Sequence, residues 1–350
     1  MQDIMYSILI EGAGTATAIS ALKGLSECGI PHKTVLLDVD DFVAGRYLAD
    51  VFYRSPPSKD ENYVDFVLEV CRKESVNLYI PIIDYGFEKL SLNKKRFSDN
   101  GIYIMIADYP SVKICSDKYL TYKFFVDNHI PTPETFTVDE KENINFKLSF
   151  IMKPKLGGRT SLDVHKIDNL AELNYNLKAG NNFVIQRFIE GKEFTADCLS
   201  NLDGSFFIDA VIRERVATKM GLAIKARILG KELSERIKGY VAKIAVLLRL
   251  PGVYNIQGFV TAEGYIFFTE INPRFAGTHA LNVKAGLNSI KHVLEMLNGK
   301  SVNDIKNSLR INYNIKMVRY WTEIFIEDDV NGDAVSSWKN LLKHSTEKNF

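Results

Sequence analysis

The first 112 residues alternate short apolar runs with amphipathic stretches, and this alternation restricts the fold more than any other feature of the sequence. The apolar runs have the length of strands and lie at 6–14, 33–40, 77–84 and 102–108. The stretches between them follow helical periodicity and lie at 16–30, 62–76 and 87–101. Alternating strands and helices are typical of parallel βαβ units. We therefore expect an α/β, Rossmann-like domain with a parallel sheet over residues 1–112.

The next segment predicts a separate small lobe. Ser116 or Asp117 can cap a helix. Pro131 and Pro133 then favour an extended linker. Strand patterns on both sides of a glycine loop follow, and after them a helical pattern. We expect a small α+β lobe over residues 113–185.

The rest of the chain predicts a larger α+β lobe with a C-terminal extension over residues 186–350. Its strand patterns are those of antiparallel hairpins, with an Asp-Gly turn signal in NLDGSF. One long amphipathic helix is expected at 231–250, and a last strand at 316–326. The total length of 350 residues fits two or three domains.

The charge balance excludes some classes of partner. The chain has 44 Lys and Arg residues against 43 Asp and Glu residues, which gives a formal net charge of +1. Neither a nucleic acid nor an anionic membrane is expected as a partner, because both select basic surfaces. Hydrophobic residues make up 46% of the chain, as in soluble globular proteins.

The cysteines and the N-terminal stretch predict a cytoplasmic protein. Cys28, Cys71, Cys115 and Cys198 are far apart and form no CxxC pair, so neither a disulfide framework nor a structural zinc site is expected. No apolar run reaches the length of about 18 residues that a membrane-spanning helix needs. Glu11 interrupts the first apolar stretch, where a signal peptide needs an unbroken one.

The turn EGAGTAT resembles part of the dinucleotide-binding pattern G-x-G-x-x-G, and Asp38 lies about where a ribose-binding acid is expected. Thr17 occupies the third glycine position. Any doubly wound sheet requires a tight turn here, whether or not it binds NAD. NAD binding is therefore the less favoured interpretation. If the turn holds a ligand, a substrate carboxylate or phosphate at the helix N-terminus is an equal alternative.

The stretch FFTEINPRF places Glu270, Asn272 and Arg274 at every second position, and positions two apart on a strand point to the same face. An exposed polar face on an edge hairpin also explains this alternation. Phe259 and Phe268 share the face in the register considered next, which favours a half-buried patch whose polar groups need partners. Arg274 suits two-pronged contact with a phosphate or a carboxylate.

A hairpin register predicts which side chains meet on this face. If Glu263–Gly264 forms a two-residue turn, Gln257 lies opposite Glu270, and Asn255 lies opposite Asn272. Directly opposed side chains have Cβ atoms about 4.5–5.5 Å apart. The resulting oxygen-rich patch suits Mg²⁺, which takes a few protein oxygens together with phosphate oxygens.

Two further segments suggest a nucleotide site. Lys153 ends an apolar strand and is followed by the glycine loop LGGRTS. Such a lysine can clamp phosphate through its charge, together with the backbone N–H groups of the loop. The extended segment VIQRFIEGKEF carries Glu193. A segment between two domains can offer backbone groups to a purine, and an acidic residue a few positions on can bind ribose hydroxyl groups.

Taken in order, these pieces resemble the ATP-grasp superfamily. The order is DKY at the start of a helix, KP with a glycine loop, VIQRFIEGKEF, Gln257 and then EINPR, and the resemblance covers about residues 1–300. The chain looks most like the stand-alone carboxylate–amine ligases of the carbamoyl-phosphate-synthetase-like group, which VIRERVATKMGLAIKARI also resembles. The resemblance implies an ATP-grasp fold, in which a Rossmann-like domain precedes two α+β lobes that clamp ATP.

The resemblance also implies roles for single residues. The residues it assigns to ATP are Lys118, Lys153, Gly157, Gly158, Ser161, Gln186, Arg187, Phe188, Ile189 and Glu193. The residues it assigns to Mg²⁺ or Mn²⁺, as two ions, are Gln257, Glu270 and Asn272. Arg274 is implied to steady the transferring phosphoryl group or the substrate carboxylate. Arg213 and Lys225 are further candidates for the same catalytic pocket.

The implied reaction has two steps. A carboxylate attacks the γ-phosphate of ATP to give an acylphosphate and ADP, and an amine then displaces phosphate. Positioning and charge stabilisation suffice, so no side-chain nucleophile is required. The chain departs from the family at Arg159 and Asp163, which puts the phosphate contacts of the glycine loop in question. Gln257 is an amide where many relatives have an acid, which lowers the charge of the metal site.

Other candidates and other functions stay open. Thr278 and His279, on the loop after Arg274, and Asp84, at the end of a strand, are candidates for substrate contact, although His279 equally fits a structural role. The expected partners are a small carboxylate, an amine and a second copy in a homodimer. The alternatives are an ATP-grasp carboxylate kinase, a carboxylate–thiol ligase, a non-catalytic nucleotide-binding protein and an NAD-binding oxidoreductase.

Overall fold

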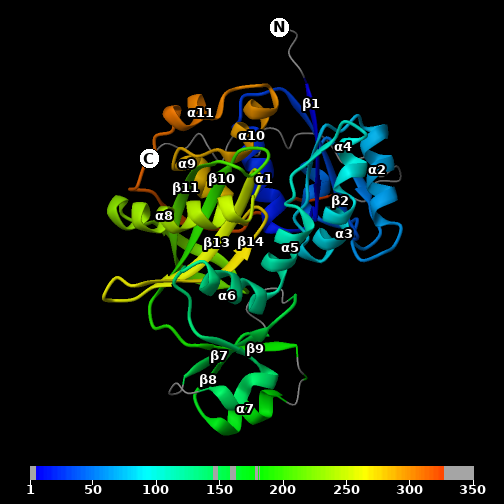
Figure 1. The fold of residues 1–350 in the computed structure, drawn as a ribbon. Coiled ribbons are helices and arrows are strands. Elements are labelled where there is room, and N and C mark those ends of the chain that lie inside the picture. The colour runs from blue at the N-terminus through cyan, green and yellow to red at the C-terminus, as the bar shows by residue number, and fades with distance from the viewer. Residues whose placement is uncertain (1–4, 145–148, 158–162, 178–179, 181, 327–350) are drawn as a thin grey trace.

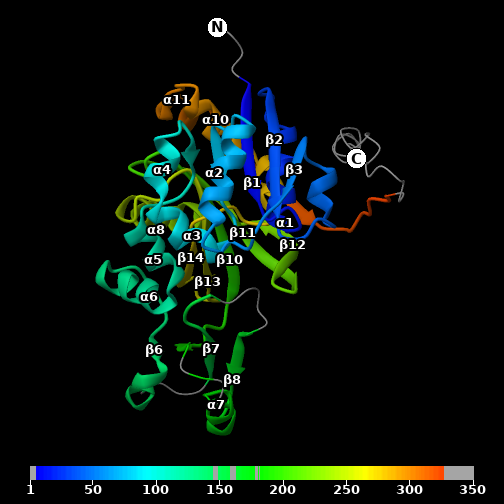
Figure 2. The same ribbon diagram turned by 90° about the vertical axis from the view of Figure 1, so that its right-hand side faces the viewer.

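The computed structural model describes residues 5–144, 149–157, 163–177, 180 and 182–326. They form three sheets of five, four and six strands (Figure 1). The four-stranded sheet lies at one end of the molecule, away from the other two (Figures 1 and 2). None of the helices in these residues is long and apolar enough to span a bilayer. Gly158 and Ser161, which the resemblance assigns to ATP, lie outside the described residues.

The N-terminal sheet is parallel, which confirms the prediction from alternating strands and helices. Its order is β3-β2-β1-β4-β5, and the strands are β1 (Tyr6–Glu11), β2 (His32–Asp38), β3 (Val51–Arg54), β4 (Leu78–Ile80) and β5 (Tyr103–Ile104). The helical elements are α1 (Ala16–Ser26), η1 (Ala44–Tyr47), α2 (Tyr63–Lys73), η2 (Asp84–Gly86), α3 (Phe87–Leu92) and α4 (Lys94–Ser98). The prediction lacked the short edge strand β3 and joined α3 to α4, which Asn93 separates.

The glycine turn after β1 is held by groups of the protein itself. Gly12 has a φ of +68°, a left-handed conformation that glycine adopts without steric cost. The Asp38 carboxylate accepts a hydrogen bond from the Gly14 amide at 2.8 Å. The Thr15 hydroxyl caps α1 by accepting from the Ala18 amide. The acid expected at a ribose therefore binds the turn, which does not favour NAD binding there.

The small lobe is an antiparallel sheet of order β6-β9-β7-β8, reached through two helices. The helices are α5 (Tyr109–Ser116) and α6 (Lys118–Asp127). Asp117, one of the two predicted caps, accepts hydrogen bonds from the Tyr119 and Leu120 amides. The elements of the lobe are β6 (Thr135–Thr137), η3 (Val138–Asn143), β7 (Phe150–Pro154), β8 (His165–Ile167), α7 (Leu170–Leu177) and β9 (Phe183–Arg187).

The six-stranded sheet has the order β14-β13-β10-β11-β12-β15 and is antiparallel. Its strands are β10 (Lys192–Ser200), β11 (Phe207–Lys219), β12 (Leu222–Ile228), β13 (Val253–Val260), β14 (Ile266–Asn272) and β15 (Lys316–Val318). The helices of this part are α8 (Lys231–Leu247), α9 (His279–Lys284), α10 (Ser289–Leu297) and α11 (Val302–Ser308). Phe194, Ile212 and Ile256 on one face share a hydrophobic cluster with Ile237 and Val241 of α8, which therefore covers that face.

The strand predicted at 316–326 is wrong beyond its first three residues. Only Lys316–Val318 forms a strand, at the edge of the sheet. Tyr320 and Trp321 beyond it are 75% and 58% exposed. Alternating apolar and polar residues predict a strand only if another element covers the apolar face. No element of the described chain covers the Tyr320 and Trp321 rings, so the strand ends before them.

The register of the β13–β14 hairpin is confirmed at the polar positions. Gln257 pairs with Glu270, and Asn255 pairs with Asn272, as predicted. Asn255 and Asn272 are buried, and Gln257 and Glu270 are half-buried. The polar face is therefore not the exposed surface of an edge hairpin.

The predicted turn of this hairpin is wrong by one residue. The Thr261 amide donates to the Tyr265 carbonyl at 2.9 Å, so the loop spans Ala262–Gly264. A β-bulge shifts the register by one residue at Gly258 and leaves Thr269 without a cross-strand partner. The longer loop and the bulge offset each other, so the polar pairs stand where the shorter turn placed them.

We expect Gly258→Ala to destabilise the protein, because this glycine lies under the bulge. A Cβ atom there would lie 2.1 Å from the Phe267 carbonyl oxygen and 2.8 Å from the Phe194 ring. Overpacking of this kind costs about 1–3 kcal/mol, which urea unfolding would show as a lower free energy of unfolding. Gly239→Ala in α8 is the control, because its Cβ would meet nothing within 4 Å. We expect that variant to gain about 0.5–1 kcal/mol. Equal losses in both variants would contradict the prediction.

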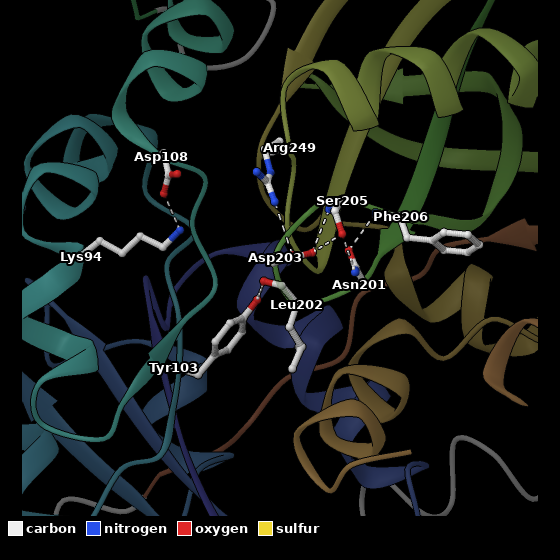
Figure 3. A network of polar contacts seen from close by, with 9 residues as sticks. All are labelled: Lys94, Tyr103, Asp108, Asn201, Leu202, Asp203, Ser205, Phe206 and Arg249. Atoms are coloured by element: carbon white, nitrogen blue, oxygen red, sulfur yellow. Dashed lines mark hydrogen bonds and ion pairs between the residues drawn. The ribbon is translucent and has the colours of Figure 1, made fainter. Parts of the chain in front are cut away.

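Direct contacts join the N-terminal sheet to the six-stranded part. The Tyr103 hydroxyl of β5 donates to the Leu202 carbonyl at 2.8 Å (Figure 3). The Tyr6 hydroxyl of β1 donates to the Asn298 side chain at 2.8 Å. Two hydrophobic clusters contain residues of both parts. The domain boundaries at residues 112 and 185 stay predictions.

Candidate active site

One face of the six-stranded sheet carries a continuous set of polar side chains, because every second residue on neighbouring strands points the same way. From β14 to β11, one row consists of Glu270, Gln257, Thr195 and Arg213. The neighbouring row consists of Asn272, Asn255 and Asp197. The opposite face is apolar and packs under α8. The predicted metal patch is therefore one end of a larger polar surface.

Asn255 orients the two amides of the patch. Its side-chain oxygen accepts hydrogen bonds from Gln257 Nε2 at 3.4 Å and from Asn272 Nδ2 at 3.3 Å. Its own Nδ2 donates to the Arg274 carbonyl at 2.9 Å. Because their NH₂ groups turn to Asn255, Gln257 and Asn272 keep their amide oxygens for other partners. The sequence placed Asn255 opposite Asn272 but did not reveal this supporting role.

Glu270 supplies the single carboxylate of the patch. No described residue donates a hydrogen bond to it or forms an ion pair with it. One carboxylate beside two amide oxygens on a half-buried face fits a hard cation such as Mg²⁺. Among the described residues, no cluster of three or more His, Cys, Asp or Glu side chains could hold a metal instead.

Lys153 reaches from the small lobe to the hairpin. Its Nζ donates to Gln186 Oε1 at 3.0 Å and to the Thr269 carbonyl at 3.4 Å. Thr269 is the bulge residue, so the bulge offers its carbonyl to the lysine. Burial lowers the pKa of Lys153 to about 8, although the charges of Glu270 and Glu193 act to raise it. The two lobes therefore meet at a buried cation close to both predicted acidic groups.

Lys118, the first residue of α6, turns toward the glycine loop. Its Nζ donates to the Gly157 carbonyl at 3.1 Å, and its amide donates to the Lys155 carbonyl at 3.0 Å. The charge of Lys118 acts to lower the pKa of Lys153. The two predicted phosphate lysines are thus near enough to repel each other, and an anion bound beside them would relieve that repulsion.

The predicted adenine segment connects β9 to β10. The Gln186 amide is used within the protein, because its Nε2 donates to Thr135 Oγ1 at 2.8 Å and its oxygen accepts from Lys153. Gln186 therefore supports the lysine instead of presenting its amide to a base. The Arg187 guanidinium lies over the Phe267 ring, 5.7 Å from the centroid. The segment ends with the half-buried Phe188 and the buried Ile189.

Glu193, the predicted ribose acid, forms an ion pair with Arg215, which the sequence patterns did not single out. Arg215 also donates to the Gly221 carbonyl at 2.7 Å. The sequence did contain a signal for Arg215. It stands two positions after Arg213 on the same strand, so both side chains point to the same face. A ribose at Glu193 has to share this carboxylate with Arg215.

Arg213 is buried and pairs with a second residue that sequence reasoning missed, Asp197. The Arg213 Nε donates to Asp197 Oδ2 at 2.7 Å, and each side chain is 4% exposed. Arg213 Nη1, Asp197 Oδ1 and Thr195 Oγ1 have no partner in the described part of the chain. The middle of the polar face therefore keeps buried polar atoms for water or a ligand. The sequence did contain a signal for these residues, because Thr195 and Asp197 follow Glu193 at every second position and so point to the same face of the strand.

Lys225 lies on the exposed side of β12, away from Arg213, and its role in the catalytic pocket stays a prediction. Lys225 is exposed, and its neighbour Ala226 is the residue that pairs with Arg215 on the polar face. Successive residues on a strand point to opposite faces. Lys225 therefore points away from the row that contains Arg213.

Arg274 and Asp84 lie together, although they are 190 positions apart in the sequence. Arg274 Nε donates to Asp84 Oδ1 at 2.7 Å, and its Nη2 donates to Asp84 Oδ2 at 3.0 Å. Asp84 begins η2 in the N-terminal domain, and Arg274 follows β14. Two residues that were assigned to phosphate and to substrate thus form one two-pronged ion pair between the parts of the molecule.

Thr278 and His279 are both buried beside α1. The Thr278 hydroxyl has no partner within the described ranges. The His279 ring is 0% exposed and packs edge-on against Phe275, with ring centroids 4.9 Å apart. Burial lowers the pKa of His279 to about 4, so the ring is neutral near pH 7. The buried ring favours the structural role that the sequence also allowed for His279, and its contact with a substrate stays a prediction.

The structure has a parallel α/β domain, a small antiparallel lobe and a larger sheet whose polar hairpin meets a buried lysine. These parts fit the ATP-grasp class. Comparison with protein families agrees with this class. Residues 115–278 match the ATP-grasp domain, and residues 8–105 match the PylC-like, N-terminal domain. The chain therefore carries an ATP-grasp domain over residues 115–278, behind a PylC-like N-terminal domain over residues 8–105.

Carbamoyl phosphate synthases are among the similar proteins. The large chain from Thermoanaerobacter sp. (strain X514) is 26% identical over 314 residues, which cover 82% of this chain. This chain spans only 28% of that relative's length. The carbamoyl-phosphate synthase of Methanobrevibacter smithii is 24% identical over 71% of this chain and 72% of its own length.

Solved structures of enzymes in complex with adenine nucleotides share the fold. N5-carboxyaminoimidazole synthetase from Staphylococcus aureus, complexed with ADP, has a TM-score of 0.68 at 17% identity over 84% of this chain and 78% of its own. The biotin carboxylase domain of the Hydrogenobacter thermophilus 2-oxoglutarate carboxylase, in complex with MgADP and bicarbonate, has a TM-score of 0.69 at 16% identity over 87% and 72%. Identities this low establish the fold alone.

Proposed function

We propose that this protein is an ATP- and Mg²⁺-dependent ligase that activates a small carboxylate as an acylphosphate and joins it to an amine. The pairing of the β13–β14 hairpin carries the proposal. It gathers Gln257, Glu270 and Asn272 on one half-buried face, and Lys153 reaches the same hairpin from the small lobe. ATP bound between the lobes would have its phosphates between buried cations and a set of oxygen ligands.

Each part of the site has a role in this proposal. Lys118 and Lys153 bind the phosphates, Gln186 supports Lys153, and Arg187, Phe188 and Ile189 line the base. Glu193 binds the ribose hydroxyl groups and shares its carboxylate between the ribose and Arg215. Gln257, Glu270 and Asn272 would hold Mg²⁺ or Mn²⁺, proposed as two ions, and the metal would supply positive charge to offset that of the phosphates. Contacts from Gly158 and Ser161 stay predictions, because these residues lie outside the described part.

The reaction needs no nucleophile from the protein, because the substrates supply both attacking atoms. A carboxylate oxygen of the substrate attacks the γ-phosphorus, and the bond from that phosphorus to the β,γ-bridging oxygen breaks, so that ADP leaves. The amine nitrogen then attacks the acyl carbon and loses a proton. The carbon–oxygen bond to phosphate breaks as the amide forms. The work of the side chains is to hold the reactants and to offset charge.

The comparisons support a small carboxylate as the class of substrate. Similar proteins are named as carbamoyl phosphate synthases, and one structure of the same fold is described with MgADP and bicarbonate. Bicarbonate is therefore the first probe, ahead of a panel of small mono- and dicarboxylates. We also propose a homodimer, because dimers are the commonest assembly. Light scattering tests it against the chain mass of 39.7 kDa.

The test is carboxylate-dependent formation of ADP from MgATP, with hydroxylamine present to trap an acylphosphate as a hydroxamate. We expect at least one carboxylate to stimulate both products. An amine that replaces hydroxylamine and gives an amide establishes the ligase. A stable acylphosphate indicates a carboxylate kinase, and a thioester indicates a carboxylate–thiol ligase. Absence of MgATP binding in calorimetry would refute the nucleotide site itself.

A further inference from the structure

The ion pair between Arg274 and Asp84 uses most of the arginine's donors. Arg274 Nε and Nη2 bind the two oxygens of Asp84, and Nη1 donates to the Phe275 carbonyl at 3.1 Å. Arginine has five N–H donors, so these three bonds leave two for a ligand. The guanidinium is thus held in one orientation and still has N–H groups to offer to an anion.

A buried carboxylate in the N-terminal domain holds the segment that carries this aspartate. Glu11, at the end of β1, is 1% exposed. It accepts hydrogen bonds from the Ile82 amide at 2.9 Å and from the Ile83 amide at 2.8 Å. Its remaining partners are the hydroxyl groups of Tyr63 and Tyr79. The two residues directly before Asp84 are therefore anchored to the centre of the parallel sheet.

We propose that Asp84 is a positioning residue for Arg274 and that Glu11 holds Asp84 in place, so that the N-terminal domain orients the arginine of the ATP-grasp site. The proposal rests on the proposed function, in which Arg274 contacts the phosphoryl group or the carboxylate. A free arginine side chain samples many rotamers and loses this freedom when it binds a ligand. A two-pronged partner that already fixes the side chain removes that cost before the ligand arrives.

The pair differs from an ordinary surface salt bridge in two ways. Exposed pairs with a single contact contribute little, because water screens them. The Arg274 and Asp84 side chains are 22% and 48% exposed, and their contact has two hydrogen bonds. The pair of Lys94 and Asp108 in the same domain is the matched comparison (Figure 3). It has one contact of 2.7 Å, and its lysine and aspartate are 36% and 74% exposed, so both partners are more exposed than those of the Arg274 pair.

The test is a double-mutant cycle on carboxylate-dependent turnover of MgATP, with Asp84→Asn, Arg274→Ala and both together. We expect Asp84→Asn to lower kcat by about tenfold to a hundredfold, as misplacement of a catalytic group does. The KM for MgATP and its calorimetric affinity should change less than about twofold. In the Arg274→Ala background, Asp84→Asn should cause no further loss, because a positioning residue acts only through its partner. Asp108→Asn should leave kcat unchanged.

Glu11→Gln extends the test into the sheet. One oxygen of Glu11 accepts from the two backbone amides and the other accepts from the two tyrosine hydroxyl groups. An NH₂ group in place of either oxygen loses an acceptor for two donors, so the anchor weakens without a change in size. We expect a similar fall in kcat and no additional fall when it is combined with Asp84→Asn. If Glu11→Gln does not fold, the cycle at Asp84 and Arg274 decides alone.

Three results on the variants would overturn the inference. Additive losses in the double variant would mean that Asp84 acts on the substrate directly. Unchanged kcat in Asp84→Asn would mean that the ion pair is only structural. Loss of MgATP binding in that variant would mean that the pair supports the nucleotide site. A wild-type protein without MgATP turnover would refute the proposed function and this inference together, whereas an active wild type with an unchanged Asp84→Asn variant would refute only the inference.

Discussion

Glu270→Ala is expected to lower carboxylate-dependent ADP formation by about a hundredfold to a thousandfold at saturating MgATP. Removal of one preorganised electrostatic group costs a reaction about this much. Glu270 is the only carboxylate of the proposed metal set, opposite Gln257 and beside Asn272. Without it, the two neutral amides have to hold the cation alone. The initial rate of ADP release, measured over a range of Mg²⁺ concentrations, gives the result.

Calorimetry separates loss of the metal from loss of the fold. We expect Glu270→Ala to bind ATP without Mg²⁺ as the wild type does and to lose the gain in affinity that Mg²⁺ gives the wild type. Glu263→Ala is the matched control, because Glu263 lies in the exposed loop of the same hairpin. That variant should keep full activity. A Glu270→Ala protein that keeps the Mg²⁺ dependence of the wild type would show that the metal binds elsewhere.

Replacement of Lys153 by methionine is expected to weaken MgATP binding at pH 7 by about a hundredfold, within the 2–5 kcal/mol attributed to breaking a buried hydrogen-bonded charge pair. Lys153 is 7% exposed and contacts both lobes. Methionine keeps the length of the side chain but not its charge. Isothermal titration with MgATP measures the loss.

The same lysine predicts the pH dependence of nucleotide affinity. Burial lowers its pKa to about 8, so the charged form is about 90% of the total at pH 7 and about 10% at pH 9. Only the charged form attracts phosphate strongly, so the affinity for MgATP should fall by roughly tenfold between pH 7 and pH 9. Lys153→Met should lack this fall. An equal pH dependence in Lys153→Met and the wild type would assign the titration to another group.

The sequence by itself determined the local order of elements and the faces of single strands. Strand-length apolar runs between helical patterns predicted the parallel N-terminal sheet, because both periods are properties of the local backbone. The alternation in FFTEINPRF placed Glu270 and Asn272 on one face for the same reason. Their opposite partners were correct even though the turn was wrong, because the extra loop residue and the bulge at Thr269 cancel.

Only the tertiary structure decided what those side chains touch. The pair of Arg274 and Asp84 joins residues 190 positions apart, and no local period encodes such a contact. The burial of His279 depends on Phe275 and α1 together. The engagement of Glu193 by Arg215 depends on the pairing of β10 with β11. The periodicity of a sequence describes one helix or strand at a time. Burial, charge pairing and the direction of a long side chain are decided only when separate elements pack against one another.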